Sequence, residues 1–237
     1  MLDLTGKVVL VTGGSRGIGA ATVRTLGAAG ADVLVHYGRG EAEARSLVAE
    51  VGREERATAL GADLAQPGAG AALFREALAW RGRVDVLVNN AGIAPTVTVD
   101  DPEDTWAGTW AQTLQVNLVV VADLCREAVL HFRTRGGGTI INVASRAAFR
   151  GDNPDAMHYA ASKGGVIALT RSIARGYARE NILAYAVAPG WVRTDMGGSR
   201  APLTVEQATE AMLHTIDELT SEQSGHFLNY DGRNMPW

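Results

Sequence analysis

An apolar run that passes directly into a cluster of glycines limits most strongly how this chain can fold. Residues 7–12 (KVVLVT) have the length of a strand and are rich in β-branched side chains. A glycine turn at residues 13–19 (GGSRGIG) follows, and the alanine-rich residues 20–29 then have the composition of a helix. Glycines allow close backbone approach to a ligand, and a helix N-terminus attracts phosphate. This order predicts a dinucleotide-binding site, the alternative being a purely structural turn.

The remaining sequence alternates between strand-like and helix-like segments. Further strands are expected at residues 33–37, 57–60, 84–89, 139–143, 183–187 and 226–229, and helices at 41–53, 70–81, 104–135, 157–179 and 205–219. The order predicts an α/β fold, a Rossmann-like doubly wound sheet of seven parallel strands with helices on both faces. Since composition shows no break, residues 1–237 are expected to form a single domain, with its ligand beyond the carboxyl ends of the strands.

Composition narrows the class of protein. The chain has 237 residues, 46% of them hydrophobic, and 22 basic against 26 acidic side chains with no charge block, which argues against a nucleic-acid or membrane partner. The first strand begins close to Met1 and no apolar run reaches membrane-spanning length, so we expect neither signal peptide nor membrane span. The single cysteine, Cys125, suits a reducing cytoplasm and is expected in the core. No metal site is expected.

Tyr159 and Lys163, in the segment HYAASKGG, are four residues apart. On a helix such a pair shares one face, so the lysine ammonium lies beside the tyrosine phenol. A free phenol has a pKa of about 10, and a neighbouring cation lowers that pKa by favouring the phenolate. The pair predicts a tyrosine that acts as general acid/base, the alternative being a solvated helix face.

Small and polar residues follow the predicted strands at the edge where a ligand is expected. The segment NNAG at residues 89–92 ends the fourth strand, where its amides can bond across strand ends. Ser145 ends the fifth strand, and Thr194 follows the break at Pro189 and Gly190 after the sixth. Asn117 lies inside a long helical run, where asparagine has poor propensity; it indicates a specific role or a polar bridge in the core.

Together these motifs resemble the short-chain dehydrogenase/reductase family over essentially the whole chain. The resemblance rests on TGGSRGIG at residues 12–19, Asp63, NNAG at 89–92, Asn117, Ser145, Tyr159 with Lys163, and Pro189-Gly190 through Thr194. It implies reversible hydride transfer between a nicotinamide cofactor and an alcohol or ketone. It also implies a catalytic tetrad. Tyr159 would be the acid/base and Ser145 would orient the substrate oxygen, while Lys163 would lower the tyrosine pKa and hold the nicotinamide ribose, and Asn117 would hold a proton-relaying water.

The resemblance further implies which residues contact the cofactor. They come from the glycine turn, the ends of the second to fourth strands, the catalytic pair and the loop after the sixth strand: Gly13, Ser15, Arg16, Gly17, Ile18, Gly19, Tyr37, Arg39, Asp63, Leu64, Asn90, Ala91, Gly92, Tyr159, Lys163, Pro189, Gly190, Val192 and Thr194. Asp63 would contact the adenine, with a helix N-cap as its alternative or additional role.

The end of the second strand indicates which nicotinamide is bound. An acidic residue there pairs with the ribose of NAD, whereas cations there bind the 2′-phosphate of NADP. By alignment on the family pattern Tyr37 occupies the acidic position, and Arg16 and Arg39 could converge on a phosphate. NADP is therefore favoured over NAD, the alternative being that both arginines are simply solvated.

The chain departs from the family pattern in three places. Ser145 and Tyr159 are fourteen residues apart, one more than expected, which predicts a bulge in the loop at residues 146–157. Residues 195–202 lead straight into the next helix, so the substrate lid is short, and residues 224–237 replace the usual double-glycine ending. These last two features look like small carbonyl reductases, whereas the middle of the chain looks more like 3-oxoacyl-carrier-protein reductases.

The favoured function is therefore an NADPH-dependent carbonyl or 3-oxoacyl reductase acting on a small-molecule ketone or secondary alcohol. The alternative is a non-catalytic dinucleotide-binding regulator, which would not need Tyr159 and Lys163 together. An epimerase or dehydratase normally carries a substrate domain for which this chain has no room. Apolar residues on the long helices, with the pairing known in the family, imply a homotetramer or homodimer. The short lid implies an open cleft for medium-sized carbonyls.

Overall fold

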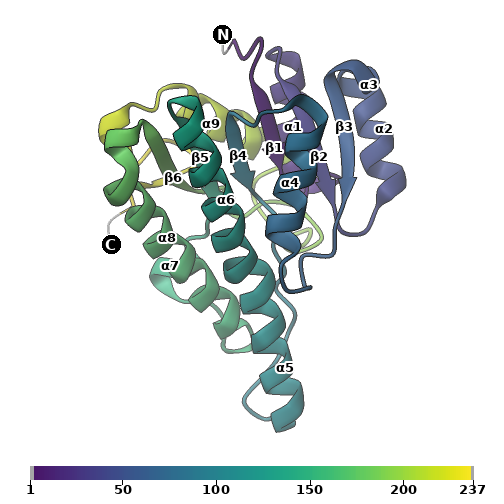
Figure 1. Cartoon of the computed structure of the whole chain (residues 1–237). Helices are drawn as coiled ribbons and strands as arrows, with labels where there is room; N and C mark the ends of the chain where they lie inside the picture. Colours follow the sequence, from purple (N-terminus) through teal and green to yellow (C-terminus); the bar gives the residue numbers. More distant parts are fainter. Residues whose placement is uncertain (1–2, 236–237) are drawn as a thin grey trace.

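The computed structural model describes residues 3–235 and contains the parallel sheet that the sequence predicts (Figure 1). Its strands are β1 (Val8–Val11), β2 (Asp32–Tyr37), β3 (Ala57–Gly61), β4 (Val86–Asn89), β5 (Gly138–Val143), β6 (Ile182–Ala188) and β7 (Phe227–Asn229). They lie in the order β3-β2-β1-β4-β5-β6-β7, and all neighbouring strands are parallel. The seven-stranded α/β fold expected from the sequence is therefore confirmed.

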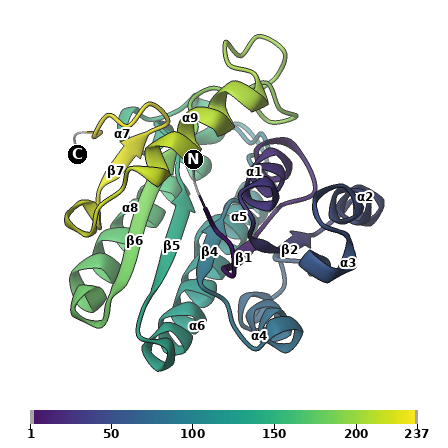
Figure 2. The same cartoon turned by 90° about the horizontal axis from the view of Figure 1, so that it is seen from above.

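Helices cover both faces of this sheet. They are α1 (Gly17–Ala28), α2 (Glu41–Val51), α3 (Arg53–Arg56), α4 (Ala69–Arg81), α5 (Glu103–Leu114), α6 (Val120–Arg135), α7 (Ala147–Arg150), α8 (Met157–Tyr177) and α9 (Val205–Asp217). Seen from above, α1, α2 and α9 lie on one face and α4, α6 and α8 on the other (Figure 2). Among residues 3–235, no helix combines the length and the apolar character needed to cross a membrane.

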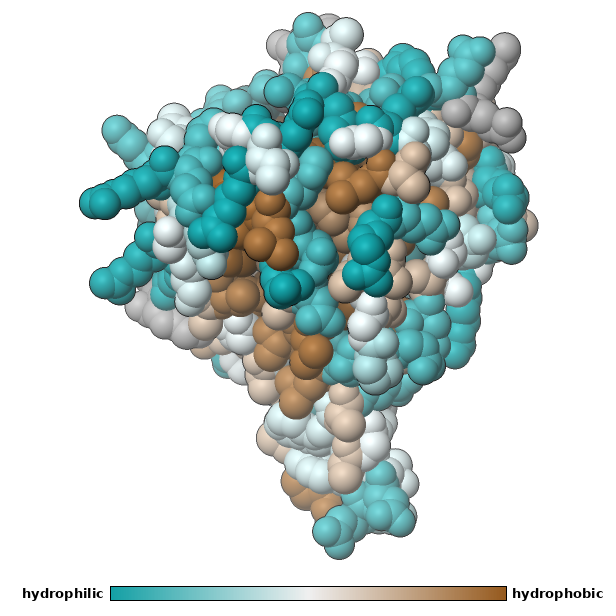
Figure 3. All heavy atoms as spheres, viewed as in Figure 1, coloured by the Kyte–Doolittle hydropathy of each residue, from teal (hydrophilic) through white to brown (hydrophobic). Residues whose placement is uncertain are grey.

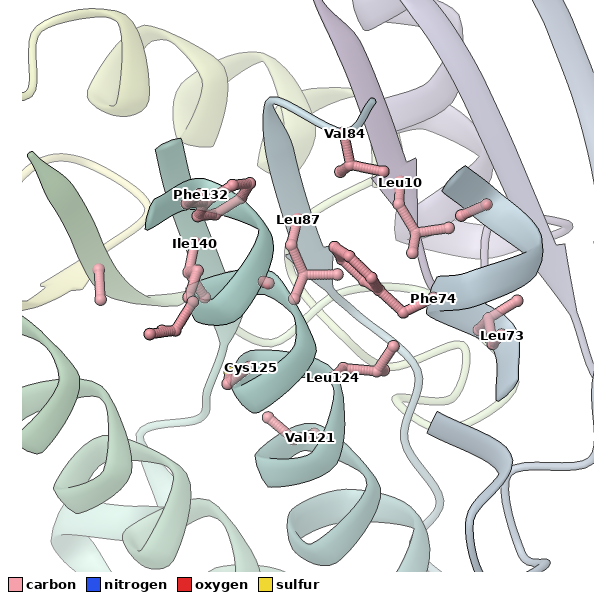
Figure 4. Packing of buried hydrophobic residues seen from close by; sticks show 14 of the residues in the cluster. Leu10, Leu73, Phe74, Val84, Leu87, Val121, Leu124, Cys125, Phe132 and Ile140 are labelled. Carbon is pink, nitrogen blue, oxygen red and sulfur yellow. The ribbon is translucent and has the colours of Figure 1, made fainter. Parts of the chain in front are cut away.

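Two large apolar clusters, one on each face, fix these layers to the sheet. The second joins α1, α2 and α9 to it. In the first, α4 and α6 pack on the central strands (Figure 4), and its fully buried members include Leu10, Phe74, Leu87, Leu124, Phe132 and Ile140. Burying one such side chain stabilises the fold by about 1.5–3 kcal/mol. Cys125 lies in the same cluster, as expected, and burial raises the pKa of its thiol to about 12.

A chain of buried hydrogen bonds crosses the sheet near its carboxyl edge. Asn89 Nδ2 on β4 donates to Asn142 Oδ1 on β5 at 2.8 Å, and Asn142 Nδ2 donates to Thr170 Oγ1 on α8 at 2.8 Å. All three side chains are buried. Because an unpaired buried polar group costs about 1–3 kcal/mol, these bonds favour one placement of α8 on the two strands.

The helix expected at residues 104–135 is not continuous. A π-helical turn, Gln115–Val119, separates α5 from α6. A π turn holds an extra residue, so side chains before it rotate relative to those after it, and such turns are common at functional sites. Asn117 lies within this turn, and α5 projects beyond the sheet on the side where the strands have their carboxyl ends (Figure 1).

The loop between β5 and α8 absorbs the extra residue noted in the sequence. It contains the short helix α7 and a 3₁₀ turn, Pro154–Ala156, directly before α8 begins at Met157. The expected bulge therefore takes the form of two short helical turns, which leave Ser145 and Tyr159 on facing segments.

Candidate active site

The glycine turn between β1 and α1 needs glycine at several of its positions. Gly13 and Gly17 have φ values of +63° and +53°, a region that favours glycine. A Cβ on Gly19 would lie 2.1 Å from the Gly13 carbonyl oxygen and 2.6 Å from Asn90 Nδ2. The N-terminus of α1 has no side-chain cap and no acidic residue in its first turn. Free N–H groups beside a turn of this shape fit a dinucleotide pyrophosphate.

The end of β4 is bonded to the end of β1. Thr12 Oγ1 accepts hydrogen bonds from the backbone N–H groups of Asn90 and Ala91, both at 3.0 Å. Asn90 Nδ2 donates to the carbonyl oxygens of Thr12 and Gly13, at 2.9 and 3.1 Å. The expectation that these asparagines bond across strand ends is correct. The hydroxyl of Thr12 is a contributor that the sequence argument did not single out.

His36 on β2 also supports the turn, and the sequence argument passed over it. Its side chain is 2% exposed. Nδ1 accepts a hydrogen bond from the Gly13 N–H at 3.0 Å, and Nε2 lies 3.0 Å from the carbonyl oxygen of Ala62. Burial lowers the pKa of His36 below 6.5. In the sequence His36 only continues the apolar run of the second strand, so no pattern there indicates its contact with Gly13.

The structure brings Tyr159, Ser145, Lys163 and Asn117 together at the carboxyl edge of β4 and β5. The hydroxyl of Ser145 is close enough to the Tyr159 phenol to lower its pKa, and the Lys163 Nζ lies 5.8 Å from the centroid of the tyrosine ring. Lys163 is 4% exposed, and its Nζ donates to the Val143 carbonyl oxygen at 2.8 Å. A Cβ on Gly92 would lie 3.6 Å from that Nζ and 3.4 Å from Asn117 Oδ1.

Hydrogen bonds to both amide atoms fix the side chain of Asn117. Its Oδ1 accepts from the Ile93 N–H and its Nδ2 donates to the Ile93 carbonyl oxygen, both at 2.8 Å. Nδ2 also lies 3.1 Å from Ser162 Oγ, which donates to the Tyr159 carbonyl oxygen at 2.7 Å. The π turn is thereby tied to the segment after β4 and to helix α8, which carries Tyr159 and Lys163.

The electrostatic state of the tyrosine differs from the expectation. The pKa of Tyr159 is raised, chiefly by burial and further by the carboxylate of Asp152, although the Ser145 hydrogen bond lowers it. Lys163 is not among the causes that shift this pKa, and its Nζ donates to the Val143 carbonyl oxygen. Burial lowers the pKa of Lys163 to about 8. Desolvation is the dominant cause and keeps the phenol protonated at neutral pH.

The two arginines expected near the adenosine ribose each lie beside an acidic residue. Arg16 is largely exposed, and its Nη1 is 3.3 Å from Asp195 Oδ2. Arg39 is exposed and close enough to Asp63 to lower the pKa of that carboxyl, although the hydrogen bond from Gln66 lowers it more. Tyr37 is half-buried and lies against Gly61. Asp63 also accepts a hydrogen bond from the Ala65 N–H and so closes a local turn, but it is not the helix N-cap given as its alternative role, because the N-cap of α4 is Gly68.

The loop after β6 faces the glycine turn. A Cβ on Gly17 would lie 3.4 Å from Thr194 Cγ2. Thr194 Oγ1 accepts a hydrogen bond from the Gly197 N–H at 3.1 Å, and Val192 forms a β-bridge with Leu203. Gly190 has a φ of +84° at the break after the strand, beside Pro189. Leu64 and Ile18 differ from the other expected contacts, because their side chains pack in or against the two apolar clusters.

Residues 7–203 match the short chain dehydrogenase family. The chain belongs to this family. A 3-oxoacyl-[acyl-carrier-protein] reductase from Synechocystis is 38% identical over 200 residues, which cover 83% of this chain and 78% of that protein. The family is one of oxidoreductases, so an enzyme acting on CH–OH and C=O groups is supported by sequence alone.

Solved structures of short chain dehydrogenases share the fold over nearly the whole chain. An NADPH-bound carbonyl reductase from chicken fatty liver superimposes with a TM-score of 0.86 at 27% identity, over 99% of this chain and 100% of that one. A short chain dehydrogenase from Burkholderia cenocepacia in complex with NADP gives 0.85 at 31% identity, over 97% and 98%. The fold and the family are thus established together.

We predict that Gly19→Ala weakens NADP⁺ binding more than tenfold, because the added methyl would displace the Gly13 carbonyl and the turn. Overpacking of this kind costs about 1–3 kcal/mol of stability as well. Gly108→Ala is the matched control, since Gly108 is in helix α5 and a Cβ there meets nothing within 4 Å. It should leave binding unchanged. Calorimetric titration of both variants checks this, and equal affinities would contradict it.

Proposed function

We propose that this short chain dehydrogenase is an NADPH-dependent reductase of ketones, with Tyr159 as general acid/base. The observation that carries the proposal is the proximity of Ser145 and Tyr159, backed by buried Lys163 and Asn117, at the same sheet edge as the glycine turn. Residues 1–237 would act as one domain that both binds the dinucleotide and carries out catalysis, in the cytoplasm.

Each residue of the tetrad has a part that its contacts support. When bound, the nicotinamide would supply the hydride that reduces the carbonyl carbon. Ser145 and Tyr159 would hydrogen-bond the substrate oxygen, and Tyr159 would donate its proton to that oxygen. Lys163 lies beside Gly92, where it would bond the nicotinamide ribose. Asn117, tied to Ile93 and Ser162, would hold the water that returns a proton to the phenol.

The protonation state of the site favours the reductive direction. Burial and Asp152 raise the pKa of Tyr159, so at neutral pH the phenol carries the proton that reduction of a ketone consumes. The Lys163 ammonium, 5.8 Å from the centroid of the tyrosine ring, would then stabilise the phenolate left after transfer. Lys163, with a pKa of about 8, would lose its charge in mild alkali. We therefore expect reduction to slow as pH rises through that value.

Exposed apolar side chains on the segments that follow β5 and β6 support an apolar carbonyl as substrate. Phe149 on α7 is about half exposed, and so are Trp191 and Met196 on the loop after β6. Trp191 is fixed there by a hydrogen bond from Nε1 to the Gly197 carbonyl oxygen at 2.8 Å. Since the loop is short, little protein surrounds the far end of the substrate. An open cleft that accepts medium-sized ketones follows, 3-oxoacyl thioesters being the alternative.

The proposed preference for NADP rests on Arg16, Tyr37 and Arg39. No carboxylate occupies position 37, and Arg16 and Arg39 lie on segments that border the end of β2. The NADPH-bound and NADP-bound short chain dehydrogenases of the same fold give further support. In this structure each arginine is next to an acid, so a phosphate would have to replace Asp195 and Asp63 as their partners.

A homotetramer or homodimer would cover the apolar surface of α6 and α8. Apolar patches gather on this side of the molecule (Figure 3), and Val119 and Leu130 are each more than 40% exposed. A second copy of the chain is the occupant that the family resemblance implies, across a two-fold axis.

We expect Tyr159→Phe to lower kcat for ketone reduction about a hundredfold or more, because the ring remains but the exchangeable proton is lost. Affinity for NADPH should change little. Tyr177→Phe, at the other end of the same helix, is the matched control and should retain full turnover. Steady-state kinetics on a panel of ketones and 3-oxoacyl thioesters measures this. Near-normal turnover by Tyr159→Phe would refute the mechanism.

Arg16→Ala and Arg39→Ala should each weaken NADPH binding by about 1–3 kcal/mol and NADH binding far less, because only NADPH offers a phosphate to pair. Tyr37→Asp should shift preference toward NADH. Arg133→Ala is the control, since Arg133 pairs with Glu180 away from the crevice. Fluorescence titration of the wild type and of each variant with NADPH and with NADH gives the dissociation constants. Equal loss for both cofactors would mean that the arginines only shape their loops.

Light scattering at micromolar concentration should report a dimer or tetramer. Leu130→Asp should shift the protein toward monomer, because it places an uncompensated charge in the proposed interface. Val99→Asp is the control, since Val99 is exposed on a loop outside this face. A monomeric wild type, or equal behaviour of the two variants, would contradict the proposed assembly.

A further inference from the structure

We propose that His36 is a positioning residue that makes dinucleotide binding depend on pH, because only its neutral imidazole holds the glycine turn in its binding shape. The inference rests on the proposed function only in taking the glycine turn as the dinucleotide site. It does not depend on NADP being preferred or on Tyr159 being the acid.

The two partners of the ring fix its tautomer. An N–H only donates, so Nδ1, at 3.0 Å from the Gly13 N–H, must be unprotonated. A carbonyl oxygen only accepts, so Nε2, at 3.0 Å from the Ala62 oxygen, must carry the proton. The neutral ring thereby joins the ends of β1, β2 and β3, and 2% exposure excludes water as a substitute partner.

Gly13 transmits the position of the ring to the binding groups. Its carbonyl oxygen accepts from Asn90 Nδ2 at 3.1 Å and lies where a Cβ on Gly19 would clash. The same residue is therefore held between His36, the end of β4 and the first turn of α1. Moving Gly13 moves the N–H groups that would face the pyrophosphate.

Protonation of His36 would break this arrangement. An imidazolium carries N–H on both nitrogens, so the Nδ1–H would point at the Gly13 N–H, donor against donor. The charge would also be buried, and burial already lowers the pKa of His36, with the Ala62 bond as the only opposing cause. The titratable and charged residues on the surrounding elements are Arg16, Tyr37, Arg39, Glu43 and Asp63. Arg16 pairs with Asp195, and Asp63 bonds Gln66 and Ala65.

The sign of the effect follows from linkage. If only the neutral ring supports binding, bound dinucleotide must lower the pKa of His36 further. Affinity is then constant well above that pKa and falls as pH drops below it, approaching about tenfold per pH unit for one proton. Since the pKa in the free protein is below 6.5, the loss lies on the acid side of that value.

Calorimetric titration with NAD⁺ from about pH 5 to about pH 8 tests the proposal. NAD⁺ is the main probe because the 2′-phosphate of NADP⁺ itself titrates near pH 6. His36→Asn is the informative variant, since its Oδ1 can replace Nδ1 as acceptor and does not titrate. His131→Gln is the matched control: His131 also accepts a backbone N–H, from Val84 at 3.2 Å, but at the opposite edge of the sheet.

We expect wild type and His131→Gln to lose NAD⁺ affinity in acid, and His36→Asn to keep nearly constant affinity within a few fold of the neutral wild-type value. Parallel profiles for wild type and His36→Asn, or a flat wild-type profile, would overturn the proposal. Should His36→Asn fail to fold, NMR titration of the wild-type ring decides: NAD⁺ must lower the pKa of His36, and an unchanged pKa refutes the role. Equal affinity for NADP⁺ and NAD⁺ at pH 8 would instead refute only the cofactor preference.

Discussion

The hydrogen-bonded junction between β1 and β4 is the contact on which the rest of the structure depends. β1 has β2 on one side and β4 on the other, so the order of strands reverses here and the crossovers leave to opposite faces of the sheet. Backbone groups beyond the last ladder bond would be unpaired at such a point. Thr12 and Asn90 pair them, and in doing so set the distance between the glycine turn and the edge that carries the tetrad. His36 provides the same support from the other side of β1.

The tetrad shows what burial does to ionisable groups. Tyr159 and Lys163 are held in a poorly solvated site, and both are shifted toward their neutral forms. A charged phenolate or ammonium costs more to bury than its neutral form, although Lys163, with a pKa of about 8, still keeps most of its charge at neutral pH. The hydrogen bond from the Lys163 ammonium to the Val143 carbonyl oxygen offsets part of the cost of burying this charge.

Much of this could be predicted from the sequence, because strands that are buried on both faces must be apolar along their length. Runs such as residues 8–11 therefore located the strands to within two residues. The π turn was not visible, since one extra residue hardly alters the apolar periodicity of residues 104–135. The spacing between Lys163 and Tyr159 is visible in the sequence and predicts a cation beside the phenol. The burial of Lys163 is not visible there. His36 was missed because its partners, Gly13 and Ala62, are backbone groups far away in sequence.

The burial of Cys125 has a consequence for how the molecule can be studied. It is the only cysteine in the chain, it lies fully buried between α6 and the sheet, and a thiol pKa of about 12 leaves almost no thiolate at neutral pH. Thiol reagents attack the thiolate, so modification has to wait until this helix separates from the strands. The rate of alkylation at Cys125 therefore measures how often the interior of this protein opens to solvent.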